Sequence, residues 1–471
     1  MMKSFTLMKF PIALAAVLLA GCSLAPNYIR PEPPIPAGWP SGPAYEERSD
    51  RDGGATVAEL AWREFFSDER LRELIGLALE NNRDLRESAL NIERARAQYR
   101  IQRANLFPFL DAAGGYSKQR IPDTSGFGQA LTLEQYSVDL GISSWEADFF
   151  GRVRSLKDQA LEEFFATEEA RRAAQISLVA EVARSYLLLA ADRELLELAR
   201  QTLKSHLATY DLTRSRFDAG VVSALDVRQA QTSVESARVD IAFFVGLVAE
   251  DENALRLLIG TSLPAELLPH ELETVTAMEE IPAGVPSEVL QRRPDILAAE
   301  HRLRGAYANI GAARAAFFPR ISLTASAGFA SAELSGLFDS DSRAWLLAPR
   351  IDLPIFTAGS LRARLRVSEV DREIFLARYE GSIQSAFREV ADALAQRGTI
   401  DEQLEAQLSL VDATAETYRL SEVRFSRGID SFLNVLDSQR SLYNTQQRLI
   451  TIRLARLTNL VTLYRVLGGG A

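Results

Sequence analysis

Long segments free of helix-breaking residues dominate the chain. Residues 152–219 contain neither glycine nor proline and are rich in Ala, Leu, Glu and Arg, which predicts one very long helix. Residues 360–427 predict an equivalent helix, with Gly381 and Gly398 as its only weak points. At a rise of about 1.5 Å per residue, each helix would extend for roughly 100 Å. Helices of this length are unusual in an ordinary globular protein.

A shorter helix is predicted after each long one, over residues 221–259 and 429–467. In the second of these, apolar residues alternate four and three positions apart, as in the seam of a coiled coil. These residues are Ile450, Leu454, Leu457, Val461 and Tyr464. A single buried core helix is the alternative interpretation. We expect packed antiparallel helices, because the lengths are too great for a globular core.

The hydrophobic period changes to two in four other segments. The predicted strands lie near residues 109–119, 133–148, 320–331 and 343–354. In the second strand, Tyr136, Val138 and Leu140 alternate with polar or small residues, which predicts one apolar and one polar face. The segments that join the strands in pairs are polar and rich in Gly, Ser and Asp, and they predict exposed loops over residues 120–132 and 332–342.

Four strands are too few to close a barrel, since about eight are the practical minimum. Two interpretations remain open at this point. Either helices cover the sheet in a soluble protein, or several copies of the chain pool their strands around a water-filled lumen. Three copies are the simplest closed solution. After residue 21 the sequence has no run of 18 apolar residues, so only strands are expected to cross a membrane.

The chain repeats its own plan. Gly220 recurs as Gly428, 208 positions later, and Pro108 recurs as Pro319, 211 positions later. Many other residues follow the same two spacings, which differ only by three residues of loop length. We predict two repeats, each built as helix, strand, strand, helix and helix. The repeats cover residues 63–270 and 287–471, with a linker at residues 271–286.

Composition narrows the possible functions. Of 471 residues, 47% are hydrophobic and 25% charged, the net charge is −10, and there is one cysteine. The acidic balance argues against nucleic acid as a partner. No sequence motif of a hydrolase, metalloprotease or nucleotide-binding loop occurs, and we expect no enzyme activity, cofactor or metal. The isolated histidines His206, His270 and His301 are expected to be core or surface residues.

The single cysteine follows a predicted leader. Residues 1–21 contain two lysines, an apolar run and a small-residue end, as a lipoprotein signal peptide does. The sequence around Cys22 resembles the bacterial lipobox, which implies acylation of this residue and delivery to the outer membrane. An ordinary signal peptide with a chance cysteine is the alternative. Residues 22–62 are proline-rich and predict an extended tether along a surface.

Several motifs carry a family resemblance that covers residues 60–470. They are Asp148-Phe149-Phe150-Gly151, Arg292-Arg293-Pro294-Asp295-Ile296, Ala316-Phe317-Phe318-Pro319, Leu353-Pro354-Ile355-Phe356, and the segment from Leu433 to Tyr443. Together with the repeat, they resemble TolC-type outer-membrane efflux proteins, in particular the lipidated branch that serves resistance-nodulation-division pumps.

The resemblance implies a mainly α-helical fold with a β-barrel part. Three copies would form a 12-stranded barrel in the outer membrane of a Gram-negative bacterium, anchored there by lipid, and a tunnel of 12 helices across the periplasm. The inner end of the tunnel would stay closed until a periplasmic adaptor protein and an inner-membrane pump engage it. Homotrimer, adaptor, pump and outer-membrane lipid are therefore the expected partners.

The turns between long and short helices are the first candidate sites. Gly220 and Gly428 end the long helices, where a left-handed conformation suits glycine. Ser223 and Asp226 match a capping box, and Ser431 is expected to cap less completely. The resemblance implies that these hairpin tips contact the adaptor, through Arg216, Arg424 and Arg427. Solvated helix ends are an equal alternative for these arginines.

The resemblance also points to a channel constriction near the start of the last helix. Family members carry an acidic ring at the tunnel's inner end, and the segment from Leu433 to Asp437 matches it. Three Asp437 carboxylates would attract cations and repel anions. Leu433 lies on the same helical face, and Asn434 replaces a second acidic residue found in some members. An exposed helix charge is the alternative interpretation of Asp437.

The predicted function is the exit duct of a tripartite efflux pump, which passively exports drugs or other small solutes. Two alternatives stay open. One is a non-conducting coiled-coil lipoprotein that bridges the envelope, and the other is the exit duct of an ATP-driven secretion system.

Overall fold

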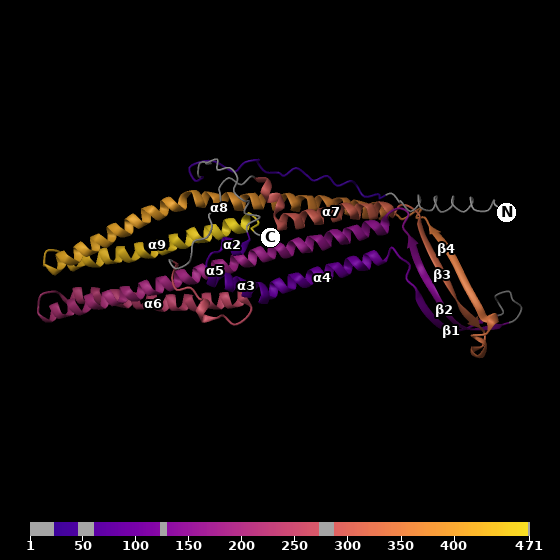
Figure 1. The fold of residues 1–471 in the computed structure, drawn as a ribbon, viewed down its shortest axis with the longest axis horizontal. Helices are drawn as coiled ribbons and strands as arrows, with labels where there is room; N and C mark the ends of the chain where they lie inside the picture. The colour runs from indigo at the N-terminus through magenta and orange to yellow at the C-terminus, as the bar shows by residue number, and fades with distance from the viewer. Residues whose placement is uncertain (1–22, 46–60, 123–129, 273–286, 470–471) are drawn as a thin grey trace. The chain divides into compact units, whose positions relative to one another are not determined.

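The structure is a computed structural model that describes residues 23–45, 61–122, 130–272 and 287–469 (Figure 1). It divides into two compact units. Unit 1 contains the described residues within 1–32, 91–168 and 298–379, and unit 2 contains those within 33–90, 169–297 and 380–471. Cys22, the predicted leader and residues 273–286 of the predicted linker lie outside the described residues.

Unit 1 contains one antiparallel sheet. Its strands β1 (Asp111–Ile121), β2 (Leu131–Ala147), β3 (Arg320–Ser331) and β4 (Arg343–Asp352) lie side by side in chain order. Each predicted strand is present, with ends shifted by two residues or fewer. The predicted loop over residues 332–342 contains two short 3-10 helices, η6 (Leu334–Gly336) and η7 (Ser340–Ser342).

The middle part of one face of the sheet is apolar, as the alternation of Tyr136, Val138 and Leu140 predicts. Leu140 of β2 pairs through Ala327 with Trp345 of β4, so their side chains share a face. Leu140 and Trp345 are both exposed in the single chain. The β2–β3 pair joins the two repeats and requires Gly328, where an added Cβ would lie 2.1 Å from the carbonyl oxygen of Val138.

Four helices contribute residues to both units: α4 (Arg83–Ala104), α5 (Arg152–Asp218), α7 (Pro294–Ala315) and α8 (Ser360–Ser426). Helices α5 and α8 have 67 residues each, and both end within one residue of the prediction. One 18-residue window of α5 is long and apolar enough to cross a membrane, but more than half of that window is buried inside the protein. This burial is typical of a core helix.

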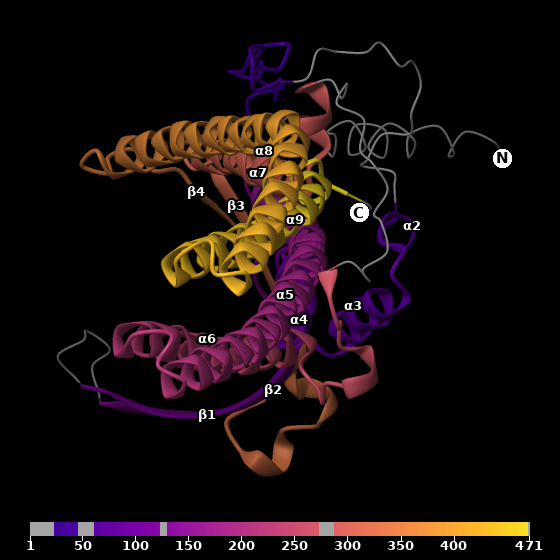
Figure 2. The ribbon, with the colours of Figure 1, turned by 90° about the vertical axis from the view of Figure 1, so that its left-hand side faces the viewer.

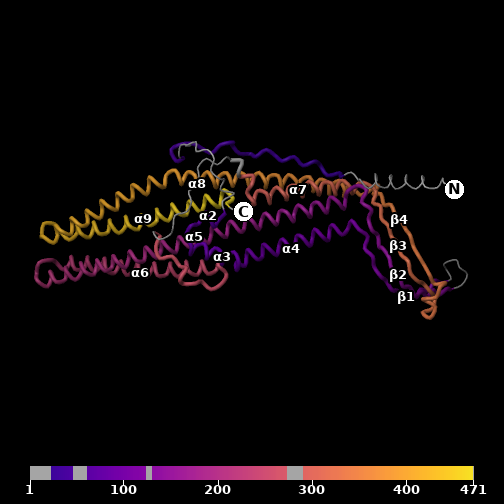
Figure 3. Tube along the Cα trace, in the orientation of Figure 1, coloured from indigo at the N-terminus to yellow at the C-terminus, as the bar shows by residue number. Residues whose placement is uncertain are grey.

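Unit 2 is built from two helical hairpins. The end of α5 turns into α6 (Ala224–Ile259), and the end of α8 turns into α9 (Phe432–Val466), as Figures 2 and 3 show. Hydrogen bonds join the helices of each hairpin, from Arg193 to Glu252 in the first and from Arg456 to Asp401 in the second. The predicted antiparallel pairs are present.

The short helices α2 (Trp62–Phe65) and α3 (Glu69–Asn81) complete the core of unit 2, with the 3-10 helices η3 (Ala265–Leu267) and η5 (Ser287–Arg292). Phe65 of α2 stacks on Tyr464 of α9 with ring centroids 4.5 Å apart, and both side chains are fully buried. Of the five predicted seam residues, Ile450, Val461 and Tyr464 are buried, and Leu454 and Leu457 are half-buried.

Two equivalent contacts in unit 2 support the repeat. The Asn82 amide, next to the start of α4, donates to the carbonyl of Leu258 near the end of α6, at 2.8 Å. The Arg293 guanidinium, next to the start of α7, donates to the carbonyl of Val466 at the end of α9, also at 2.8 Å. Donors and acceptors are 211 and 208 positions apart, the two spacings of the sequence repeat.

Of the predicted tether, the structure describes residues 23–45, which form no helix and no strand, and residues 61–62, where α2 begins at Trp62. Tyr28 and Arg30 contact Glu300 of α7 in unit 1. Trp39 stacks on Phe387 of α8 in unit 2, with ring centroids 4.8 Å apart. The segment is therefore held against helices at both places, as an extended tether along a surface would be.

Candidate functional site

Both long helices end at a glycine in the left-handed conformation. Gly220 has φ 76° and Gly428 has φ 72°, and an added Cβ at either position would meet no atom within 4 Å. The conformation, and not a lack of space, therefore favours glycine. The chain reverses through equivalent hydrogen bonds, from Val221 to the Arg216 carbonyl and from Ile429 to the Arg424 carbonyl, each at 2.9 Å.

The two short helices begin differently. At α6, the Ser223 hydroxyl accepts from the Asp226 backbone and the Asp226 carboxylate accepts from the Ser223 backbone, so the predicted capping box is present. At α9, the Ser431 side chain makes no capping hydrogen bond. The expectation of a partial cap there is wrong. The Asn434 backbone N–H instead donates to the carbonyl of Ser431 at 3.2 Å.

The three predicted tip arginines have different surroundings. The Arg216 guanidinium lies over the Phe425 ring, 4.7 Å from its centroid, and so joins α5 to α8. Arg424 forms a two-point ion pair with Asp430 at 2.5 and 3.0 Å, which holds the pKa of Asp430 below its usual value. Arg427 is exposed, and its side chain has no ion pair or hydrogen bond with any described residue.

The predicted constriction residues Leu433, Asn434 and Asp437 form one exposed stripe on α9. The opposite face of the same turns is buried, in a cluster that joins α9 to α6 and α8. This cluster consists of Ala230, Phe425, Phe432, Val435 and Leu436, with Tyr210 and Tyr418 packed against it. The structure therefore brings the three predicted residues together and directs them away from the hairpin core.

Asp437 has a partner that sequence reasoning missed. It forms an ion pair with Arg440, one turn later on α9. The side chains are 57% and 70% exposed, so the pair is accessible to water in the single chain and contributes little to stability. Residues three positions apart are neighbours on a helix, so the spacing of Asp437 and Arg440 in the sequence could have predicted this ion pair.

A hydrogen-bond network beneath the stripe was also missed. The Gln439 amide donates to Ser205 of α5 at 3.0 Å and to Tyr418 of α8 at 3.3 Å. The Tyr443 hydroxyl donates to Asp240 of α6 at 3.2 Å. These bonds link α9 to three other helices of unit 2. The contacts join residues far apart in sequence, so no local pattern indicates them.

A cavity of about 400 Å³ lies beside the stripe, lined by residues of α5, α6 and α9. Its walls include Leu433, Arg440 and Tyr443, together with Asp240 and His206. Burial lowers the pKa of His206. His206 is therefore a neutral half-buried residue, in keeping with the core role expected from the sequence.

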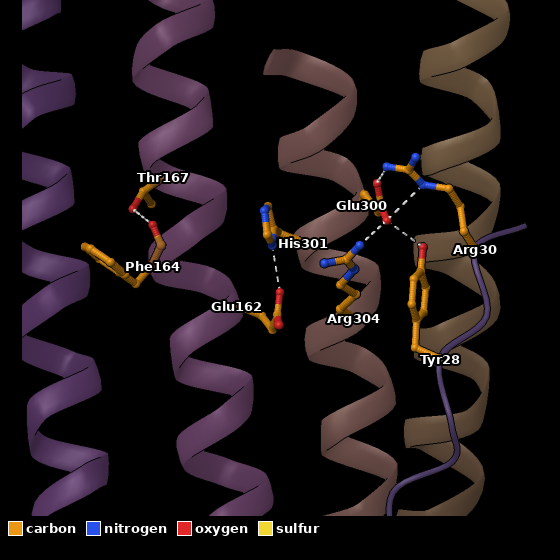
Figure 4. Close-up of polar contacts among 8 residues, drawn as sticks. All are labelled: Tyr28, Arg30, Glu162, Phe164, Thr167, Glu300, His301 and Arg304. Atoms are coloured by element: carbon orange, nitrogen blue, oxygen red, sulfur yellow. Dashed lines mark hydrogen bonds and ion pairs between the residues drawn. The ribbon is translucent and has the colours of Figure 1, made fainter. Parts of the chain in front are cut away.

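A second histidine, His301 of α7, has a specific partner. His301 lies 2.7 Å from the carboxylate of Glu162 on α5, within unit 1 (Figure 4). The Glu162 side chain is 23% exposed, and its pair with His301 joins α5 to α7. Within the described residues, no group of three His, Cys, Asp or Glu side chains is arranged to hold a metal ion.

Comparison with known proteins decides the family. The sequence profile described as "Outer membrane efflux protein" matches residues 74–261 and 285–469, one match in each repeat. The chain belongs to the outer membrane efflux protein family.

Individual relatives of this efflux protein are close and of full length. It is 52% identical to the toluene efflux pump outer membrane protein TtgC of Pseudomonas putida, over 98% of this chain and 95% of TtgC. A membrane protein of Pseudomonas aeruginosa has a solved structure with 44% identity and a TM-score of 0.89, which covers 95% of this chain and 98% of that chain.

The open-state outer membrane channel MtrE of Neisseria gonorrhoeae is 39% identical and has a TM-score of 0.85. The comparison covers 95% of the efflux protein and 98% of MtrE. These relatives confirm the predicted fold, which is that of trimeric outer-membrane efflux channels. The efflux protein is an outer-membrane channel that takes part in tripartite efflux pumps. Membership in this family of channels decides against the alternative of a non-conducting protein that only bridges the envelope.

Proposed function

We propose that the efflux protein is a passive exit duct whose inner end is closed by the stripe of Leu433, Asn434 and Asp437 from three copies. The observation that carries this proposal is the exposure of the stripe on α9, directly above a buried core. Three copies around an axis would bring the Asp437 carboxylates together. Carboxylates that converge in a pore favour cations and oppose anions.

The proposed partners are a periplasmic adaptor protein, which contacts the hairpin tips, and an inner-membrane pump of the resistance-nodulation-division type. Exposed apolar side chains support a docking role, because Val221 and Leu225 on the first tip and Ile429 on the second are all exposed. Arg427 adds an exposed charge beside them. Arg216 and Arg424 hold the tips together, so we assign them a supporting role in adaptor contact.

The proposed cargo is small, apolar organic solutes. Its support is the name of the relative TtgC, a toluene efflux pump component, at 52% identity over nearly the whole chain. A strain that lacks its own outer-membrane channel and expresses this protein with a matching pump should regain tolerance to toluene. Unchanged sensitivity, with the channel present in normal amount, would contradict this cargo assignment.

The proposed anchor is lipid on Cys22, which the sequence pattern around this residue supports. Two or more acyl chains would give stable attachment. Metabolic labelling with palmitate should mark the wild-type protein and leave Cys22→Ser unlabelled. Persistent label in the Cys22→Ser variant would refute acylation at this residue.

The gate proposal is tested by Asp437→Ala. In a planar bilayer, purified trimers of this variant should show a leak current raised by about tenfold, equal to a barrier lower by about 1.4 kcal/mol, and a weaker preference for cations. The matched control is Asp412→Ala, which removes an exposed carboxylate on α8. If Asp437→Ala leaves conductance and cation preference unchanged, Asp437 does not form the gate.

A further inference from the structure

The segment from Leu24 to Arg30 lies along one stripe of α7 in unit 1. Arg314 donates to the Leu24 carbonyl at 3.3 Å, Tyr28 packs edge-on against Tyr307, and the Tyr28 hydroxyl donates to Glu300 at 3.0 Å. The helix positions in contact alternate four and three apart, which places them on a single face. They are Glu300, Arg304, Tyr307, Gly311 and Arg314.

The two elements match in length. Six residue steps of extended chain, from Leu24 to Arg30, cover about 20 Å at roughly 3.3 Å per residue. Fourteen residue steps of helix, from Arg314 back to Glu300, cover about 21 Å. The segment therefore runs antiparallel to α7 and stays in register with it over its whole length. We call residues 24–30 the strap.

Glu300 is the centre of the strap's polar contacts (Figure 4). Its side chain is only 2% exposed, and it accepts hydrogen bonds from Tyr28 and Arg30 of the strap and from Arg304 of α7. Burial alone would raise the pKa of Glu300, but these donors outweigh burial and hold the pKa below its usual value of 4.5. A buried carboxylate without such partners would be strongly unfavourable.

Close packing fixes the other end of the strap. A Cβ added at Gly311 would lie 2.8 Å from the backbone nitrogen and from the Cβ of Ala25, and 2.7 Å from the hydroxyl of Ser155. The strap can approach α7 here only because the helix lacks a side chain. Gly305 on the same helix differs, since a Cβ there would make ordinary contacts of 3.6 Å or more.

We propose that the contacts between the strap and α7, centred on Glu300 as a positioning residue, fix the N-terminal anchor at the end of α7 next to β3. We call these contacts the clasp. Leu24 contacts Arg314, the last residue but one of α7, and β3 begins at Arg320. Cys22 precedes Leu24 by two residues, so covalent geometry limits their Cα atoms to about 7 Å apart. The clasp thus sets the depth of the acyl anchor relative to the membrane-spanning strands. This role rests on the proposed acylation of Cys22.

The test uses the full-length chain with a spin label at Ile29→Cys. Ile29 lies between Tyr28 and Arg30 in the sequence, and its side chain is 80% exposed. A label at this position should therefore leave the contacts with Glu300 intact. The label should be immobile in the otherwise wild-type protein and mainly mobile in Glu300→Gln and in Gly311→Ala. Gly305→Ala is the matched control and should keep the label immobile. An immobile label in Glu300→Gln would overturn the clasp.

The second readout is the amount of heat-stable trimer in the outer membrane. Glu300→Gln should lower it by about threefold in the acylated protein, and should cause no further loss when combined with Cys22→Ser, because the clasp acts through the anchor. Equal losses in both backgrounds would show a merely structural role and overturn the proposal. Palmitate content separates the two proposals, since a wild-type chain without palmitate would overturn the acylation itself.

Discussion

At the scale of single residues, local patterns predict contacts between neighbours in sequence and fail for distant ones. The capping box of Ser223 and Asp226 was predictable because its two members lie only three positions apart, at the first turn of one helix. Ser431 has the same position in the second repeat, but its hydroxyl does not cap. Its neighbour Asp430 is engaged by Arg424. The contacts of Gln439, Tyr443 and Glu300 depend on the fold, and no sequence pattern shows them.

The Asp437–Arg440 pair leads to a prediction about ion selectivity. Each Arg440 places a positive charge beside a carboxylate of the proposed ring, so Arg440→Ala should increase the preference for cations by about twofold or more. Reversal potentials of single trimers under a salt gradient measure this preference. Arg419→Ala is the control, since Arg419 forms the same kind of exposed pair with Glu416 on α8. A preference equal to that of wild type would show that Arg440 lies away from the ion path.

A second residue-scale prediction concerns pH. Burial, followed by the neighbouring carboxyl group of Asp192 and the charge of Glu250, raises the pKa of Asp251 to about 7. Burial also raises the pKa of Asp192, and the Arg193–Glu252 ion pair lies beside these groups. Between the usual pKa of 3.8 and about 7, the native state keeps a proton that the unfolded state has lost. Stability from this group is therefore lost as pH rises through that window.

Asp251→Asn removes this ionisation, so the thermal unfolding midpoint at about pH 8 should be higher than in wild type. The midpoint of the variant should also fall less steeply as the pH rises from about 4 to about 8. Asp412→Asn, an exposed change on α8, should leave the profile as in wild type. A decline equally steep in Asp251→Asn would mean that other groups cause it.

At the scale of elements, breakers and periodicity predicted the helices and strands well. The ends of α5 and α8 were predictable because glycine follows each of them. The starts of α6 and α9 lie three residues later than predicted, since the residues after each glycine complete the turn before the helix begins. The short 3-10 helices η6 and η7 were not foreseen, because three residues carry no periodic signal.

Two glycines of the second repeat give a matched prediction. Gly428 has φ 72°, whereas Gly381 lies within α8, and an added Cβ at either position meets nothing within 4 Å. Gly428→Ala should destabilise the protein by about 1 kcal/mol through left-handed strain. Gly381→Ala should stabilise it by about 0.5–1 kcal/mol through helix propensity. Thermal unfolding measures both, and shifts of the same sign would contradict the assignment of the turn.

At the scale of the whole molecule, the internal repeat predicted the order of helices and strands in both halves of the chain. Its two spacings, 211 and 208, recur in the contacts from Asn82 to Leu258 and from Arg293 to Val466. The expectation that several copies share one barrel followed from the number of strands. Among the described residues the sheet has only four strands, and β1 and β4 lie at its open edges. Counting strands gave three copies as the simplest closed solution, and the family resemblance implied the same homotrimer.

The central claim is that copies of this chain assemble into a conducting duct that is closed at rest. Its most direct test is single-channel recording of the purified oligomer in a planar bilayer, with the number of chains determined beforehand from its mass in detergent. Three chains per particle and a small, cation-preferring conductance are the predicted result. A particle of one chain that passes no current would contradict the account.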